Sequence, residues 1–403
     1  MKTTSDIRKQ NILNVLRALS HQEHMTKNDV ASETGLTVMT VNTLMNGLLC
    51  VGLIREDGIT ESVGGRPAFL YRLNTEKYYL AGVDIHLDGF TMQICNLGMQ
   101  PLYLKSFPIE KGKDSADVLD MVKAELEREF ADLRIPRESL LGIGVVFPAV
   151  VDTEEGLHSL FQHSRMWEGS PVKQYLKQEF GTKVLVEKDT FASVLCLKRQ
   201  FGDELRNAVS VIIKGGIGGG ILVDGKIFRG ENGVAGEFGH MCMEKNGLEC
   251  RCGDYGCLEM YASDIAVISR ASQMLGDGMD SVLLASTADG SPVDIDMVVK
   301  GYNDEDPLCR QVLDTAAEYL CEGLCNIIKL YDPSHIILAS VWVKQAKGLA
   351  DTIEREIANK CNFQGKNKVN LHCTADKHIH VNGAINLVYE TIMNSIESNP
   401  FLT

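Results

Sequence analysis

The chain has 403 residues, a hydrophobic fraction of 44% and a net charge of −14. That length exceeds what one hydrophobic core normally holds, so we expect two or three domains. The sequence has no apolar run of about 18 residues, which argues against a membrane-inserted protein. The polar N-terminus is not typical of a secretory signal, and the twelve Cys, many in apolar segments, are typical of free thiols in a reducing compartment. We therefore expect a cytoplasmic protein.

The negative charge is unevenly distributed along the chain. Residues 1–73 carry a net charge of +1, whereas the remaining 330 residues carry −15. Such an acidic body excludes a protein that binds nucleic acid over its whole surface. DNA binding is compatible with this charge pattern only for the near-neutral N-terminal segment.

Three helices are expected in residues 1–73. Apolar residues at helical spacing predict a first helix that ends at about Ser20. A second helix begins after Thr26, an N-cap with an acidic residue at the capping-box position, and ends at Gly35. Thr37 caps a third helix that continues through Leu49.

Two short strands follow the third helix, and a Gly-Gly-Arg-Pro hairpin tip at residues 64–67 joins them. Three helices and a hairpin are typical of a winged helix-turn-helix that places its third helix in the major groove. The candidate DNA contacts are Lys27, Thr37, Thr40, Asn42, Thr43, Asn46 and, at the hairpin tip, Arg66. Small three-helix units also act as dimerisation modules, and the third helix has no Arg or Lys, so this alternative stays open.

The body begins with a segment typical of a buried strand, followed by two segments in which apolar and polar residues alternate. Residues 79–85, 90–97 and 101–107 predict a three-stranded meander, followed by a helix over 114–133 and a fourth strand over 141–147. A second lobe begins near Asp189, and a last helix from Gly383 to Ile396 returns to the first lobe. A strand meander followed by βα units predicts an α/β body.

One short segment carries a metal-ligand pattern. His240, Cys250, Cys252 and Cys257 follow the spacing H-x9-C-x-C-x4-C. Three thiolates and one imidazole suit a closed, tetrahedral Zn²⁺ site. Cys242 is close in sequence, but the other four residues already complete a tetrahedron, so we expect it to be a bystander.

A glycine run at residues 215–220 follows a predicted strand and precedes the metal-ligand segment. Together with the Gly-Gly-Arg-Pro tip, these features resemble the ROK family of sugar kinases and sugar-responsive repressors, along essentially the whole chain. The resemblance implies an α/β fold: a winged helix-turn-helix at 1–73 and a two-lobed, actin-like (ribonuclease-H-like) body with a structural zinc loop. It places the small lobe at 76–188, completed by 383–403, and the large lobe at 189–382.

The resemblance also implies a carbohydrate site. Its members are Lys188, Asp189, Glu237, His240 and Glu259. In family kinases the residue that matches Asp189 is the base that deprotonates the sugar hydroxyl. Lys188 replaces a sugar-binding Asn of the family. It can pair with Asp189, recruit an anionic effector such as a sugar phosphate or sugar acid, or point to solvent or pair with Glu187.

Two of the three nucleotide-binding elements of family kinases are altered. His86-Leu87-Asp88 stands where the family has two Gly and a Thr at the phosphates, and Ala339-Ser340 replaces a Gly-Gly turn on the adenosine side. Only the glycine run at 215–220 remains, and a tight hairpin turn explains it equally well. We therefore expect no enzyme activity.

The sequence thus predicts a repressor of carbohydrate-utilisation genes that a sugar or sugar derivative, bound between the lobes, releases from a palindromic operator. The expected partners are operator DNA, the effector and a second copy of the chain in a homodimer or tetramer. The main alternative is an ATP-dependent sugar kinase with a regulatory N-terminal module. A third possibility is a docking module whose zinc loop contacts a transporter component.

Overall fold

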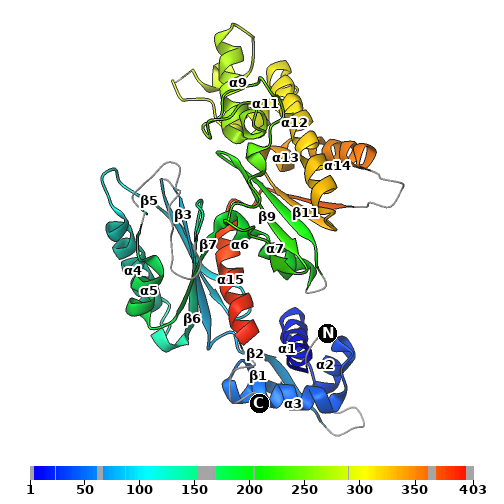
Figure 1. Cartoon of the computed structure of the whole chain (residues 1–403). Coiled ribbons are helices and arrows are strands. Elements are labelled where there is room, and N and C mark those ends of the chain that lie inside the picture. The colour runs from blue at the N-terminus through cyan, green and yellow to red at the C-terminus, as the bar shows by residue number, and fades with distance from the viewer. Residues whose placement is uncertain are drawn as a thin grey trace. The chain divides into compact units, whose positions relative to one another are not determined.

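The computed structural model describes residues 4–22, 24–60, 67–86, 88–151, 167, 169–202, 205–288, 290–361 and 369–395 (Figure 1). The chain divides into two compact units. Unit 1 comprises Met1–Glu187 and Ala384–Thr403, and unit 2 comprises Lys188–Gly383.

The head, which we define as residues 4–73 of unit 1, has three helices and one two-stranded antiparallel sheet. Its elements are α1 (Thr4–His21), α2 (Lys27–Thr34), α3 (Val38–Val51), β1 (Ile54–Ile59) and β2 (Phe69–Leu73). The predicted caps are confirmed. Thr26 and Asp29 form a capping box at the start of α2, Gly35 ends α2 in the left-handed conformation, and Thr37 caps α3. The local sequence alone therefore determines where these helices begin and end.

The helices α2 and α3 are bent by 115° relative to each other across three residues that include Gly35. By length and composition only, this bent pair passes a test for a membrane span. In the part of the chain that the structure describes, no single helix is long and apolar enough to pass it.

Unit 1 contains a mixed five-stranded sheet in the order β5-β4-β3-β6-β7. The strands of this sheet are β3 (Tyr79–His86), β4 (Gly89–Asn96), β5 (Pro101–Pro108), β6 (Leu140–Phe147) and β7 (Lys183–Lys188). The helices of unit 1 outside the head are α4 (Ser115–Asp132), the short 3-10 helix η1 (Arg137–Ser139), α5 (Val172–Phe180) and the later part of α15 (Ile379–Ser395). β3, β4 and β5 form the predicted antiparallel meander, and β6 adds in parallel to β3.

The two faces of this sheet are covered by different helices. Val83 and Ile85 of β3 pack into the core formed with α4 and α5. Leu80, which points to the opposite face, packs against Ile385 and Val388 of α15. Figure 1 shows α4 and α5 on one side of the sheet and α15 on the other. The alternation of side chains along β3 thus determines which helix each residue meets.

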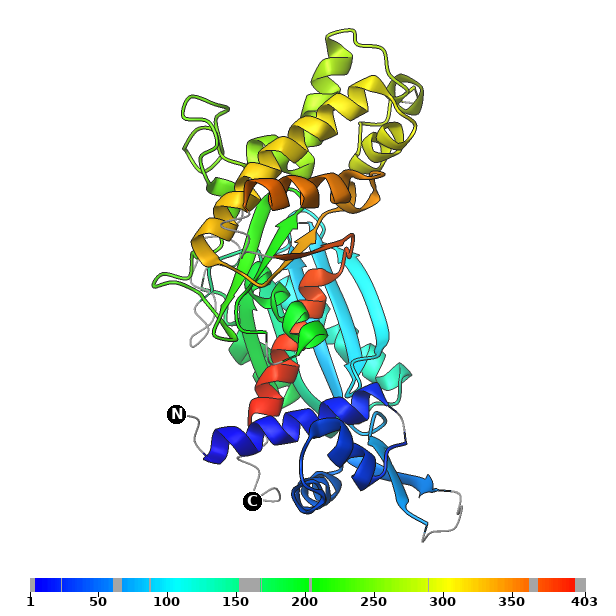
Figure 2. The ribbon, with the colours of Figure 1, turned by 90° about the vertical axis from the view of Figure 1, so that its right-hand side faces the viewer.

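The core of the head is continuous with the rest of unit 1. Met393 of α15 and Leu97, which follows β4, are both buried in the cluster that α1, α2 and α3 form. The hydroxyl of Tyr78 donates to the carbonyl of Val51 at the end of α3, at 2.8 Å. Figure 2 shows α1 next to the C-terminal end of α15.

Unit 2 has a second mixed sheet in the order β10-β9-β8-β11-β12. Its strands are β8 (Ala208–Ile213), β9 (Ile217–Val223), β10 (Lys226–Ile227), β11 (His335–Ala339) and β12 (Asn370–Thr374). β8, β9 and β10 form an antiparallel meander, and β11 and β12 add in parallel. This arrangement repeats that of unit 1, which agrees with the expected two-lobed α/β body.

The helices of unit 2 are α6 (Asp189–Ser193), α7 (Leu195–Phe201), the 3-10 helix η3 (Phe238–His240), α8 (Glu259–Ala262), α9 (Asp264–Gly276), α10 (Leu283–Ser286), α11 (Ile295–Asn303), α12 (Pro307–Tyr331), α13 (Val341–Gln345) and α14 (Leu349–Lys360). One large apolar core joins β8, β9 and β11 to α9, α11, α12, α13 and α14. α6 contacts β8 and β9. The last helix, α15, begins at Ile379, four residues before the predicted start at Gly383, and residues 396–403 lie outside the described residues.

Candidate functional site

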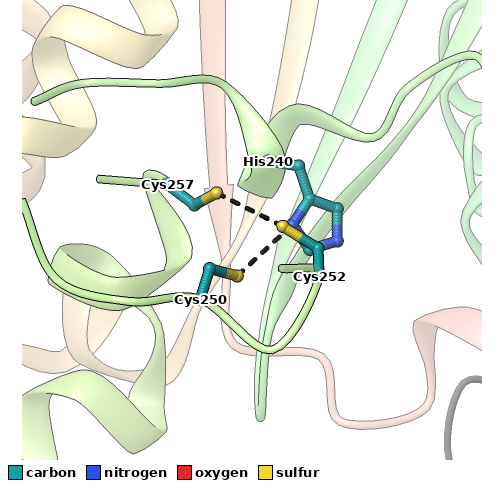
Figure 3. Close-up of side chains that lie close together, drawn as sticks. All are labelled: His240, Cys250, Cys252 and Cys257. Atoms are coloured by element: carbon teal, nitrogen blue, oxygen red, sulfur yellow. Dashed lines mark hydrogen bonds between the residues drawn. The ribbon is translucent and has the colours of Figure 1, made fainter. Parts of the chain in front are cut away.

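The four predicted metal ligands come together in unit 2. The donor atoms of His240, Cys250, Cys252 and Cys257 all lie within 4.8 Å of one another (Figure 3). His240 ends the short helix η3, and the three Cys come from the loop that leads to α8. Cys242 is not part of this group, and its thiol donates to a backbone carbonyl at 3.5 Å. The arrangement can hold one metal ion.

The spacing of these donors fits a tetrahedral ion. Two thiolates bound to zinc at about 2.3 Å stand about 3.8 Å apart. Cys252 Sγ lies 3.6 Å from Cys257 Sγ, and Cys250 Sγ lies 3.7 Å from His240 Nδ1. Burial raises the pKa of the Cys257 thiol to about 11 and also raises the pKa of Cys250. Binding of a metal ion would therefore displace the protons of these two thiols, which are released to solvent.

The loop is also anchored by contacts that need no metal. Gly256 has φ +71°, and a Cβ there would lie 1.7 Å from the carbonyl oxygen of Glu244, so only glycine fits. The hydroxyl of Tyr319 of α12 donates a hydrogen bond to the carboxylate of Glu244. The hydroxyl of Tyr261 also donates to this carboxylate, at 3.3 Å from Oε2. The two rings stack at 4.2 Å. These contacts attach the loop to α8 and α12.

The carbohydrate candidates Glu237 and Glu259 lie on either side of His240. The Nδ1 atom of His240 faces the thiols and is 3.8 Å from Glu259 Oε1. Its Nε2 atom is 3.9 Å from Glu237 Oε2. Cys250 Sγ lies 3.1 Å from Glu259 Oε1. One ring nitrogen of His240 is thus available to a metal, while the other faces the side of the loop that carries Glu237.

Lys188 pairs with Glu237. Its Nζ lies 2.5 Å from Glu237 Oε1 and 5.0 Å from the centre of the Phe191 ring. The Lys188 side chain is 7% exposed, whereas that of Glu237 is 40% exposed. Among the alternatives left open by the sequence, a solvent-facing Lys188 is therefore wrong. Its ion pair is with Glu237, a partner that the sequence analysis did not consider.

Asp189 makes different contacts. Its Oδ1 accepts from the backbone N–H of Thr190 at 2.5 Å, and its Oδ2 lies 3.5 Å from His380 Nδ1. Both Asp189 and His380 are buried. Sequence reasoning missed His380, because nothing in its neighbourhood connects it to a residue 191 positions earlier. The resulting site combines an Asp–His pair with a Lys–Glu pair.

A family model described as "ROK family" matches residues 81–390, which is most of the chain. The chain belongs to the ROK family.

Three characterised relatives of this ROK protein illustrate its similarity. It is 25% identical over 397 residues to the DNA-binding transcriptional dual regulator NagC of Escherichia coli, covering 97% of this chain and 95% of NagC. It is 24% identical to the xylose repressor of Caldicellulosiruptor bescii, over 82% of each chain. It is 24% identical to the xylose repressor of Bacillus subtilis, over 91% of each chain.

Solved structures share the fold. A ROK family transcriptional regulator, described as a homologue of the E. coli MLC protein, matches with a TM-score of 0.79 and 24% identity over 98% of this chain and 99% of its own. The ROK hexokinase of Thermus thermophilus matches with a TM-score of 0.63 and 21% identity, over 78% of this chain and 99% of its own. The fold shared with the regulator therefore covers about a fifth more of this ROK protein than the fold shared with the hexokinase.

The glycine run of this ROK protein is a packing feature of the β8–β9 hairpin. The strands pair from Ala208 to Ile213, and the turn between them is Lys214-Gly215-Gly216. A Cβ at Gly219 would lie 2.4 Å from the ring of Phe238 and 2.4 Å from the carbonyl oxygen of Ser210. Close packing within the unit thus explains the glycine at this position without a bound phosphate.

The Glu259 carboxylate and the backbone of Asp264 flank the hairpin turn. A Cβ at Gly216 would lie 2.9 Å from Glu259 Oε2. The backbone N–H of Asp264 donates to the carbonyl of Lys214 at 2.9 Å. Burial raises the pKa of the Asp264 carboxyl to about 7. The positive charge of Lys214 acts to lower this pKa, and the negative charge of Asp296 acts to raise it. Asp264 is therefore partly protonated near neutral pH, and the Glu259 carboxylate beside Gly216 is what makes this turn less favourable for a phosphate group.

The two altered kinase elements have ordinary local structures. Ser340 is the N-cap of α13, and its hydroxyl accepts from the backbone N–H of Val343 at 3.2 Å. His86 and Asp88 flank the β3–β4 hairpin, while Leu87 lies outside the described residues. The Ala339-Ser340 segment thus serves to start a helix.

The predicted DNA contacts of the head lie at the start of α2 and on α3. Asn42, Thr43 and Asn46 are exposed on α3, and Thr37 and Thr40 at its start share a hydrogen bond at 2.9 Å. The Nζ of Lys27 donates to Asn42 Oδ1 at 2.6 Å and to Asn46 Oδ1 at 2.9 Å. Arg66 lies outside the described residues. Lys27 is therefore engaged by α3 and is not a free cation for phosphate.

Proposed function

We propose that this ROK protein is a cytoplasmic, sugar-responsive transcriptional repressor. In this proposal the head is a winged helix-turn-helix that binds a palindromic operator, with the chain acting as a homodimer or tetramer. Lys188, Asp189, Glu237, His240 and Glu259 bind a carbohydrate or sugar phosphate. Binding of that effector lowers the affinity for the operator.

The head is the observation that carries this proposal. The similarity to NagC extends over 97% of this chain, whereas the similarity to the hexokinase extends over 78%. A bend of 115° between α2 and α3, with a three-residue connection containing Gly35, lies in the range of helix-turn-helix units. The antiparallel β1–β2 pair then supplies the wing.

The proposed metal is Zn²⁺. A donor set of three thiolates and one imidazole favours zinc over Mg²⁺ or Ca²⁺, which prefer oxygen ligands. When bound, the ion organises the loop and contributes no reaction step. His240 would hold it through Nδ1, which fixes the tautomer and leaves Nε2 as an N–H donor towards Glu237 or an effector hydroxyl.

The carbohydrate site suits a ligand with several hydroxyl groups. The carboxylates of Glu237, Glu259 and Asp189 are acceptors for buried O–H groups, which each need a partner. Lys188 adds a cation that an acidic or phosphorylated effector would meet. A regulatory response needs a binding free energy of the effector that differs by only about 1–3 kcal/mol between the DNA-bound and the DNA-free protein.

The test combines DNA selection with an effector panel. The full-length, zinc-loaded protein is used to select duplexes from a random pool, and its affinity is measured by fluorescence anisotropy with neutral sugars, sugar acids and sugar phosphates. We expect a palindromic sequence, and one class of effector that weakens binding at least five-fold. Asp189→Asn should retain DNA binding and lose the response. Failure to enrich any sequence would overturn the proposal.

An ATP-dependent sugar kinase is the second candidate, and Asp189 favours it because it matches the catalytic base of family kinases. The carboxylate of Glu259 beside the hairpin turn argues against phosphate binding. The deciding measurement is a coupled assay with MgATP and each sugar of the panel. Phosphorylation that Asp189→Asn abolishes would place the kinase first.

A further inference from the structure

The outward face of α3 has an unusual composition for a DNA-binding helix. Met39, Asn42, Thr43, Asn46 and Cys50 are exposed at the spacing of a single helix face. From Val38 to Val51 the helix contains no Asp, Glu, Lys or Arg. This face therefore offers apolar and neutral polar groups, and any charge for phosphate contacts must come from elsewhere in the head.

Two adjacent apolar side chains dominate the first turn of α3. Met39 is 80% exposed and Val38 is 50% exposed, although the other side of the helix is buried in the head. The N-terminal residues of a recognition helix are those that reach base edges in the major groove. The only apolar group that a base pair presents there is the 5-methyl group of thymine.

Lys27 determines which atoms of the two Asn side chains face outward. An ammonium group can only donate, so Asn42 Oδ1 and Asn46 Oδ1 turn towards Lys27 Nζ, at 2.6 and 2.9 Å. The Lys27 ammonium is also held 5.3 Å from the centre of the Tyr71 ring. The amide Nδ2 groups are consequently directed away from Lys27, and they present N–H donors on the exposed face.

Thymine matches this combination of groups. Its major-groove edge has one acceptor, O4, and one methyl group, whereas guanine has acceptors without a methyl and cytosine has a donor. We propose that α3 reads thymines of the operator: Val38 and Met39 pack against 5-methyl groups, and Asn42 and Asn46 donate to O4, with Lys27 as the residue that positions both amides. This inference rests on the proposed DNA-binding function.

The experiment replaces thymine by deoxyuridine, which retains O4 and base pairing but lacks the methyl group. The probe is a duplex enriched from the random pool by the full-length protein, and each thymine of a half-site is replaced in turn at constant salt. Loss of one buried methyl contact should weaken binding about three- to five-fold at one or two positions. The same replacement outside the half-sites should have no effect.

Variants assign the effect to residues. Met39→Ala and Val38→Ala should each remove the sensitivity to deoxyuridine at their own position. Ile7→Ala, which removes an exposed apolar side chain of α1 (51% exposed), should leave it unchanged. Lys27→Met should reduce discrimination between thymine and cytosine with little change in salt dependence, whereas a direct phosphate contact would lower the salt slope by about one. Circular dichroism checks that each variant is folded.

The outcomes separate this inference from the proposed function. Selective binding that deoxyuridine leaves unchanged at every position would overturn thymine reading and leave the repressor proposal standing. A uniform loss of affinity in Lys27→Met, with a reduced salt slope, would overturn the positioning role of Lys27. A protein that enriches no DNA sequence would overturn both proposals.

Discussion

The ammonium group of Lys188 lies 2.5 Å from Oε1 of Glu237, and the two side chains differ strongly in exposure, at 7% and 40%. The pair places a buried cation beside a carboxylate that solvent reaches. Because an uncompensated buried charge costs more than an exposed one, the two partners are not equivalent.

Removing Glu237 should therefore be more damaging than removing Lys188. We expect Glu237→Gln to lower the free energy of unfolding by about 1–3 kcal/mol, since it removes the carboxylate that lies 2.5 Å from the buried Lys188 ammonium. Lys188→Met should cost less than about 1 kcal/mol, because Glu237 can be solvated. Urea denaturation of both variants and of the double variant measures the difference. Equal losses for the two single variants would contradict a buried pair of this kind.

The cysteine cluster predicts a defined metal content. The purified protein should contain one zinc ion per chain, and Cys250→Ala, Cys252→Ala and Cys257→Ala should each lose it, because a closed site needs all four ligands. Cys242→Ala is the matched control in the same loop and should retain the ion. Zinc is measured by elemental analysis after dialysis. Loss of zinc from the Cys242→Ala variant would show that Cys242 is a ligand and that the proposed set of four ligands is wrong.

Asp264 predicts a pH-dependent stability. Burial raises its pKa in the folded protein to about 7, so the folded state holds a proton that the unfolded state has released above about pH 4. The stability associated with Asp264 is therefore fully present below about pH 4 and is lost as the pH rises to 7.

Asp264→Asn removes this titration. Its gain in the free energy of unfolding over the unsubstituted protein should be larger at pH 8 than at pH 5, by roughly 1–3 kcal/mol. Urea denaturation at the two pH values measures it. Asp277→Asn, at the exposed residue that follows the last turn of α9, is the control and should show no such difference. An identical gain at both pH values would mean that Asp264 is charged in the folded protein.

The glycine run offers a test of its structural role. Gly219→Ala should lower the free energy of unfolding by about 1–3 kcal/mol or more, because the added Cβ would lie 2.4 Å from the Phe238 ring and from the carbonyl of Ser210. Gly215→Ala should cost little, since its Cβ would meet only Ile265, at 3.5 Å. Thermal denaturation compares the two variants. Comparable destabilisation by both would show that the turn itself also requires glycine.

Much of the fold could be predicted from local patterns. Thr26 and Thr37 begin α2 and α3 as expected, because a cap is a contact between residues two or three positions apart. The short apolar run around Val83 identified β3 for the same reason, since the pattern of a buried strand is local. The start of α15 was predicted at Gly383 but lies at Ile379, where no capping signal marks it in the sequence.

The sequence by itself determined the family, the order of the elements and the candidate metal-binding cluster, because its four residues span only 18 positions and short spacing constrains geometry. Only the tertiary structure decided that Lys188 pairs with Glu237, that Asp189 meets His380, and that Lys27 turns the amides of Asn42 and Asn46. Those partners lie 15 to 191 positions apart. A side chain selects such a partner through the packing of whole elements, and no local pattern encodes that choice.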